Sequence, residues 1–142
     1  MSGFITSYGE DLLLDLVCRR RVSPEFLYLA LLTQPGNRYS SGYDIAEPTV
    51  AEYKRVVLGN APGNWEQRGG EMANADAVSL PFYFTEPWPL IVGWALVDAP
   101  EGGQVLWAGD LSPVQPTQGS SLAIPAGGLV IRTMAYASGV GR

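Results

Sequence analysis

The sequence predicts a mainly β fold, either an antiparallel β-sandwich or a jelly-roll-like barrel of about seven or eight strands, with one N-terminal α-helix. Three observations carry this prediction. Only the N-terminal segment has the periodicity of an amphipathic helix. Apolar runs then follow at spacings of roughly 8–15 residues, as in all-β domains. The 17 glycines and 11 prolines lie between these runs, where they are typical of turns.

The chain has the length of one ordinary domain, because 142 residues suffice for a single hydrophobic core. We expect residues 1–142 to form one unit without internal repeats. Within it, we expect residues 1–6 to form an N-terminal arm, 7–21 the helix, 24–136 the β-sandwich and 137–142 a flexible tail.

The expected helix over residues 7–21 has recognisable start and end signals. Ser7 is placed as the N-cap and Glu10 follows three residues later, which is the spacing of a capping box. Arginines at positions 19–21 complement the negative end of the helix dipole. Cys18 is expected to be packed, and as a single cysteine it allows no intrachain disulfide. The buried face is expected to be Leu12, Leu13, Leu16 and Val17.

The first expected strand, residues 26–32, contains almost no polar residue. We therefore expect a central strand covered on both faces, on one of them by the helix. Residues 34–49 then form a long loop in which Tyr39 and Tyr43 are the exposed aromatic side chains. Loops longer than about 12–15 residues are uncommon unless they bind something, so this loop is a candidate interaction site.

Further apolar runs predict the remaining strands of the sheet. Pro81 within one of them indicates an edge or a bulge, because proline cannot donate to a strand ladder. The turn at residues 99–103 predicts a hairpin between its two neighbours. The expected strands are residues 53–58, 65–67, 77–84, 90–98, 104–108, 121–124 and 128–133.

The composition argues against most chemistry and several classes of partner. The chain has no histidine and one lysine, Lys54, which removes histidine-dependent catalysis and makes phosphate chemistry unlikely. We expect no enzyme, no metal and no cofactor. The formal net charge of −5 argues against nucleic acid as a partner. There is no apolar run long enough to span a membrane, so we expect no membrane partner.

The tryptophans divide into two expected groups. Trp94 and Trp107 lie in apolar runs and are expected in the core. Trp65 follows a polar stretch and Trp88 lies between two prolines, so both are expected near the surface. Exposed aromatic side chains serve protein interfaces and sugar binding alike. An interface or structural packing is the favoured interpretation, and sugar binding stays open as the alternative.

Several short segments, taken in order along the chain, carry a resemblance to known proteins. They include Leu27-Tyr28-Leu29-Ala30-Leu31, Glu52-Tyr53-Lys54-Arg55-Val56, Gly93-Trp94-Ala95-Leu96, Leu106-Trp107-Ala108-Gly109 and Pro125-Ala126-Gly127-Gly128-Leu129. The ordered set resembles a family of small tailed-bacteriophage virion proteins, labelled tail fibre, minor structural or capsid decoration proteins. Residues 59–72 depart from the family pattern. The resemblance implies a structural protein of the virion, made in the host bacterial cytoplasm, and supplies no catalytic residues.

Three functions follow as hypotheses. The first is a capsid decoration or cement subunit that binds the major capsid protein on the outer shell. The second is a tail, tail-tip or fibre component that contacts other tail proteins and the host surface. The third, from a different class, is a carbohydrate-binding module. We expect a homo-oligomer, with a trimer as the first guess. The candidate interface residues are Phe4, Ile5, Tyr39, Tyr43, Trp65 and Trp88.

Overall fold

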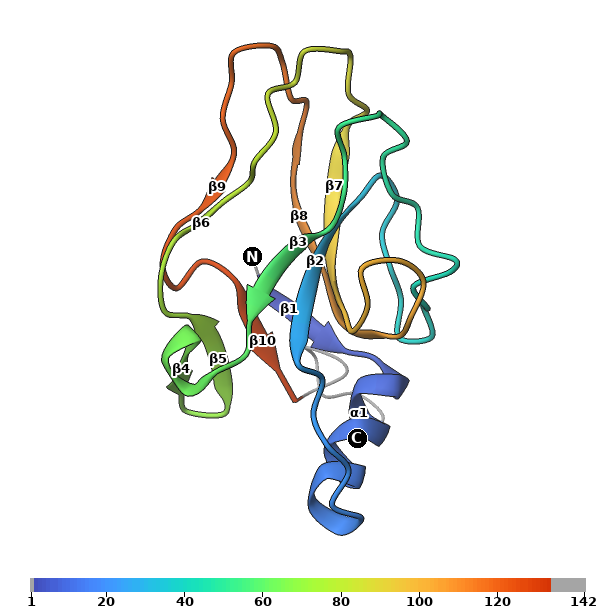
Figure 1. The fold of residues 1–142 in the computed structure, drawn as a ribbon, viewed down its shortest axis with the longest axis vertical. Coiled ribbons are helices and arrows are strands. Elements are labelled where there is room, and N and C mark those ends of the chain that lie inside the picture. The colour runs from blue at the N-terminus through green and yellow to red at the C-terminus, as the bar shows by residue number, and fades with distance from the viewer. Residues whose placement is uncertain (1, 134–142) are drawn as a thin grey trace.

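The computed structural model describes residues 2–133 and shows a curled β-sheet with one helix beside it (Figure 1). The mainly β fold class with an N-terminal helix is therefore confirmed. The helix is α1 (Ser7–Cys18), and a short 3-10 turn, η1, covers Pro62–Asn64. In the described part of the chain the strands are β1 (Ser2–Ile5), β2 (Phe26–Leu32), β3 (Val56–Gly59), β4 (Trp65–Arg68), β5 (Glu71–Asn74), β6 (Val78–Ser79), β7 (Ile91–Val97), β8 (Val105–Val114), β9 (Ala123–Ile124) and β10 (Val130–Arg132).

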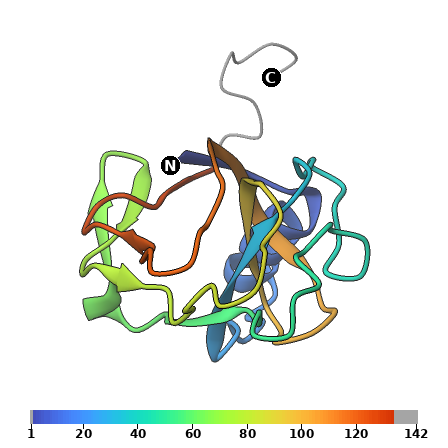
Figure 2. The same cartoon turned by 90° about the horizontal axis from the view of Figure 1, so that it is seen from above.

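The main sheet has eight strands in the order β3-β2-β7-β8-β1-β10-β5-β4, and β6 pairs with β9 in a separate two-stranded sheet. Seen from above, the main sheet curls around a common centre as a half-barrel (Figure 2). All pairs in it are antiparallel except β1 with β10, which are parallel. The sheet is thus mixed, a detail that the expected antiparallel sandwich or barrel did not include.

The first residues form a strand inside the sheet, so the prediction of an N-terminal arm over residues 1–6 is wrong for the described part of that segment. β1 pairs with β8 on one side and β10 on the other, and Ile5 is 1% exposed. A glycine is needed at its centre, because a Cβ at Gly3 would lie 2.4 Å from the ring of Trp94. The pairing partners are more than 100 residues away, and no local pattern marks them.

The helix begins at a different cap from the one predicted. Thr6 is the N-cap, and its hydroxyl accepts a hydrogen bond from the Gly9 N–H at 3.1 Å. The predicted capping box of Ser7 and Glu10 is therefore wrong. The same hydroxyl is within hydrogen-bonding distance of two carbonyls of β8, those of Val105 and Leu106. Thr6 thereby ties the start of the helix to the sheet, and α1 packs mainly against β8.

The end of the helix is also shorter and more exposed than expected. α1 ends at Cys18 instead of residue 21, and Cys18 is an exposed thiol, so its predicted packing is wrong. Val17 is 83% exposed, whereas Leu12 is buried. Arg19 and Arg21 follow the last turn of the helix, and each forms an ion pair at 3.5 Å with the carboxylate of Asp15.

The core consists of two clusters, one on each face of the sheet. The larger cluster fills the inside of the half-barrel, and the smaller one lies under the loop of residues 34–49, where Ile45 packs on it. β2 contributes to both, so its prediction as a strand covered on both faces is confirmed. The predicted cover by the helix is not, because α1 packs mainly against β8. Trp94 is fully buried, as predicted, while Trp107 is half-buried.

Trp88 lies in the aromatic centre of the larger cluster. It is 4% exposed, and its ring centroid lies 4.9 Å from that of Phe84 and 5.0 Å from that of Phe82. The prediction that Trp88 lies near the surface is therefore wrong. The flanking prolines suggested an exposed connector, but the chain folds back at this point and places the indole inside the half-barrel.

Several strand boundaries differ from the prediction, and in one case a side chain takes over the backbone hydrogen bonds. The expected strand 77–84 is reduced to β6, because the N–H groups of Tyr83 and Phe84 both donate to the Glu52 carboxylate at 2.9 Å. Phe84 also has a φ of 57°, which a strand cannot contain. β5 was not predicted at all, and β8 continues to Val114, well past its predicted end at residue 108.

Candidate functional site

The predicted interface residues do not gather on one surface. Tyr39 and Tyr43 are 70% and 82% exposed, as predicted, and lie on the same loop. Trp65 and Phe4 are half-buried. Ile5, like Trp88, is buried in the core, which leaves neither side chain available on the surface of this chain. Two surfaces result: the loop that carries the tyrosines and a cleft beside Trp65.

The loop that carries the tyrosines, called the tyrosine loop here (residues 34–49), is irregular but firmly held. Its main anchor is Arg55, whose side chain is 4% exposed. The guanidinium donates to the Glu47 carboxylate at 2.8 Å and to the carbonyl of Gly42 at 3.0 Å. It also donates to the carbonyls of Ala99 and Gly102, both at 2.8 Å. One buried cation therefore joins the tyrosine loop to the turn between β7 and β8.

Tyr53 completes this buried network. Its hydroxyl donates to Glu47 and accepts the backbone N–H of Leu31 at 3.2 Å. Burial, together with the neighbouring Glu47 carboxylate, raises the pKa of Tyr53 above the usual range of a tyrosine. The hydroxyl therefore stays protonated at neutral pH and acts as a structural hydrogen-bond donor.

The other end of the tyrosine loop is attached to the helix. Arg38 forms an ion pair with Glu10 of α1, and the carbonyl of Arg38 accepts the Ser7 N–H at 2.8 Å. Glu10 therefore binds Arg38 of the tyrosine loop instead of forming the capping box that the sequence predicted. Side-chain oxygens of Asn37, Ser40, Ser41 and Asp44 accept backbone N–H groups within the loop. The loop presents Tyr39 and Tyr43 on a preorganised backbone.

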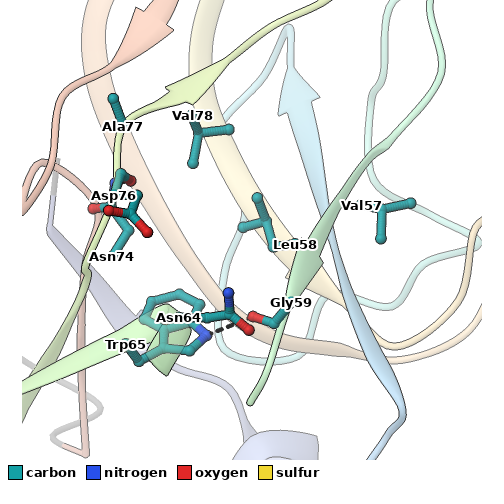
Figure 3. Close-up of a pocket in the computed structure, with 9 residues that line it drawn as sticks. All are labelled: Val57, Leu58, Gly59, Asn64, Trp65, Asn74, Asp76, Ala77 and Val78. Carbon is teal, nitrogen blue, oxygen red and sulfur yellow. Dashed lines mark hydrogen bonds between the residues drawn. The ribbon is translucent and has the colours of Figure 1, made fainter. Parts of the chain in front are cut away.

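The cleft beside Trp65 lies where the half-barrel fails to close. β3 and β4 are the two edges of the sheet, yet the chain passes from one to the other through residues 60–64 alone. No backbone ladder joins these edges among the described residues. Instead, the Trp65 indole N–H donates to the Gly59 carbonyl at 2.9 Å (Figure 3). One side chain therefore closes the seam at its lower end.

Above that hydrogen bond the seam stays open as a cleft of about 250 Å³, called the seam cleft here. Residues 57–59 of β3 form one wall, and Asn74 with residues 76–78 forms the opposite wall (Figure 3). Trp65 and Asn64 lie across the bottom of the view. The lining combines apolar side chains with a few amide and carboxylate groups.

Among residues 2–133 there is no group of three histidine, cysteine, aspartate or glutamate side chains placed to hold a metal ion. The described helix is also too short and too polar to cross a membrane.

The comparison with protein families decides the relationship of this chain. A family described as podophage GP4 fiber I protein gp80 matches residues 4–132. The chain belongs to this family. The match runs from within β1 to the end of β10, and so includes nearly all of the half-barrel, the helix and both candidate surfaces. It confirms the predicted resemblance to tailed-bacteriophage virion structural proteins. No curated protein matches the chain.

The sequence missed the residues that hold the tyrosine loop in place. Arg55 stands in an ordinary Tyr-Lys-Arg-Val segment, and its partners lie up to 47 positions away. Thr6 was assigned to an N-terminal arm. An arginine at the start of an apolar run is a weak sign of burial, and only the tertiary contacts identify it as an anchor.

Proposed function

We propose that this protein is a non-enzymatic structural component of a podophage tail fibre, made in the host bacterial cytoplasm and incorporated into the virion. The observation that carries the proposal is the family match over residues 4–132, whose description names a fibre protein.

The fibre assignment was the second hypothesis from the sequence, behind capsid decoration. The half-barrel alone does not distinguish the two, because a compact β domain suits either place. The family description names a fibre and not a decoration protein, and this favours the second hypothesis. Decoration of the capsid is not confirmed and becomes the competing outcome of the test.

Assembly into a fibre requires contacts with other virion proteins or with further copies of this chain. The tyrosine loop is our candidate for such a contact. Tyr39 and Tyr43 present large amphipathic rings, and their backbone is already ordered, so contact costs little conformational entropy. A homo-oligomer, with a trimer as the first case to test, remains part of the proposal.

The location is tested by quantitative mass spectrometry of purified virions together with immunogold labelling. We expect a copy number far below that of the major capsid protein, and gold particles on the tail. A copy number close to that of the major capsid protein, with label over the head, would establish decoration instead.

The contact surface is tested by a double variant, Tyr39→Ser with Tyr43→Ser. We expect reduced incorporation into virions or reduced adsorption to cells, with an unchanged thermal midpoint of the purified protein. The matched control is Tyr83→Ser, because Tyr83 is 79% exposed but lies outside the tyrosine loop. If the control reduces incorporation or adsorption as much as the double variant does, the tyrosine loop is not the contact surface.

A further inference from the structure

The seam cleft has the chemistry of a small binding site, and the proposed structural function gives it no role. The seam is where a barrel would close by pairing its last two strands. Here β3 has a paired strand on one side only, β2, within the described part of the chain. The opposite edge of β3 therefore presents backbone groups to the cleft.

The direction of these backbone groups follows from one hydrogen bond. The Gly59 carbonyl is turned toward the seam, because it accepts the Trp65 indole N–H. Backbone groups of alternate residues in a strand point to the same side. The N–H and C=O of Val57 consequently face the seam too. They provide one donor and one acceptor beside a side chain that is 56% exposed.

Two side chains add polar groups to the rim of the seam cleft. The carboxylate of Asp76, an exposed residue, has no hydrogen-bond or ion-pair partner among residues 2–133. The Asn64 side-chain oxygen accepts the Ala61 N–H at 3.0 Å, which leaves its amide nitrogen available. Gly59 makes room for this side chain, because a Cβ there would lie 2.3 Å from the Asn64 oxygen.

Asn74 shapes the wall of the cleft instead of facing a ligand. Its amide nitrogen donates to the carbonyls of Asp76 and Pro125, at 2.8 Å and 3.1 Å. Its oxygen accepts the Leu129 N–H at 2.8 Å. With these groups engaged, the buried Asn74 holds the backbone at Asp76 in place and so positions that carboxylate at the rim.

The remaining lining is apolar and includes the Trp65 indole together with Leu58 and Val78. An apolar floor with hydrogen-bonding groups around its rim suits a ligand that has an apolar face and several hydroxyls. A sugar ring has both features. The volume of about 250 Å³ lies below the roughly 300–1,000 Å³ of sites for drug-sized ligands, so one ring fits better than a chain.

The charge and the shape of the cleft narrow the ligand class further. Asp76 is the one charged residue in the described lining, which disfavours an anionic ligand. An added peptide strand is also disfavoured, since β3 has four residues and residues 60–65 close one end of the seam. We propose that the seam cleft binds a neutral sugar, as one hexose unit of a saccharide.

The test uses the purified full chain, a glycan array of neutral saccharides and a ¹H–¹⁵N NMR titration with the hexose that scores best. We expect saturable shifts of the Trp65 indole resonance and of the amides of residues 57–59 and 76–78. Asp76→Asn is expected to weaken binding about tenfold, because a hydrogen bond from a sugar hydroxyl to a charged carboxylate is replaced by one to a neutral amide. The matched control is Asp11→Asn, the same charge change on α1, with affinity unchanged.

Three results would overturn the proposal: no array hit among neutral saccharides, shifts confined to residues outside the seam cleft, or equal weakening by both variants. Trp65→Phe provides a second arm, since it keeps an aromatic ring but loses the bond to Gly59. If the NMR spectrum of Trp65→Phe shows a changed seam cleft but its affinity for the saccharide is unchanged, the proposal is also contradicted. All of these results are independent of where the protein lies in the virion, so the fibre assignment can stand if the sugar site fails.

Discussion

Replacing Arg55 by methionine is the most informative single change in this fold. The substitution keeps a long apolar stem but removes every hydrogen bond that the guanidinium makes. The Glu47 carboxylate then lies partly buried without its cation, and the carbonyls of Gly42, Ala99 and Gly102 lose their donor. Removing one partner of a buried ion pair typically costs about 3–5 kcal/mol. We therefore expect the free energy of unfolding to fall by about 4 kcal/mol.

The measurement is urea unfolding at pH 7, followed by circular dichroism and tryptophan fluorescence, with a thermal scan alongside. For a chain of this length the loss corresponds to a decrease in thermal midpoint of roughly 10–15 °C. The matched control is Arg19→Met, because the ion pair of Arg19 with Asp15 is at the surface and its side chain is 78% exposed. We expect a change of less than about 0.5 kcal/mol for the control.

A double-mutant cycle with Glu47→Gln separates the ion pair from the three carbonyl contacts. If Arg55 and Glu47 are coupled as the structure shows, the free energy of unfolding falls less in the double variant than the sum of its decreases in the two single variants. Our reasoning is refuted if Arg55→Met costs less than about 1 kcal/mol, or if the control is equally destabilised. Additive single effects would refute the coupling alone.

Three further predictions test the caps, the close contacts and the buried tyrosine. Thr6→Val is expected to cost about 2 kcal/mol, because the helix loses its N-cap and the side chain no longer has a hydroxyl to donate to the β8 carbonyls. Ser7→Ala is expected to be nearly neutral, and urea unfolding of both variants distinguishes the structural cap from the predicted one. Gly42→Ala is expected to cost about 1–3 kcal/mol, since its Cβ would lie 1.7 Å from a carbonyl oxygen, whereas Gly63→Ala meets nothing within 4 Å and should leave the thermal midpoint unchanged. The pKa of Tyr53 is raised in the folded protein, whereas a tyrosine in the unfolded chain ionises near pH 10. The free energy of unfolding is therefore unaffected by ionisation of this residue below about pH 9. It falls as the pH rises past about 10, by up to about 1.4 kcal/mol per pH unit. Tyr53→Phe removes that part of the decline, and the same steepness between pH 9 and 11 in both proteins would contradict the assignment.

The parts of the fold that the sequence predicted well are those with local signals. The run from Phe26 to Leu32 contains almost no polar residue, and the strand predicted there is β2. The tyrosine loop was recognised from its glycines, prolines and polar residues, and the exposure of Tyr39 and Tyr43 followed from that context. The hairpin of β7 and β8 was marked by its turn.

The candidate surfaces were only partly predictable. Trp65 was expected near the surface from its polar neighbours, and it does line an open cleft. Trp88 was expected near the surface because of its flanking prolines, but it is buried, because the rings of Phe82, Phe84 and Trp88 pack together inside the half-barrel. The residues next to a tryptophan in the sequence do not determine its burial, because burial depends on the side chains that surround it in space.

The sequence by itself determined the class of fold, the single N-terminal helix, the central strand β2 and the relationship to phage virion proteins. Only the tertiary structure decided that residues 2–5 are a strand between β8 and β10, and that Thr6 and Arg55 tie the helix and the tyrosine loop to the sheet. The physical reason is the range of the interactions. Periodicity and turn residues act over a few positions, but the partners of β1, Thr6 and Arg55 become neighbours only when the sheet curls.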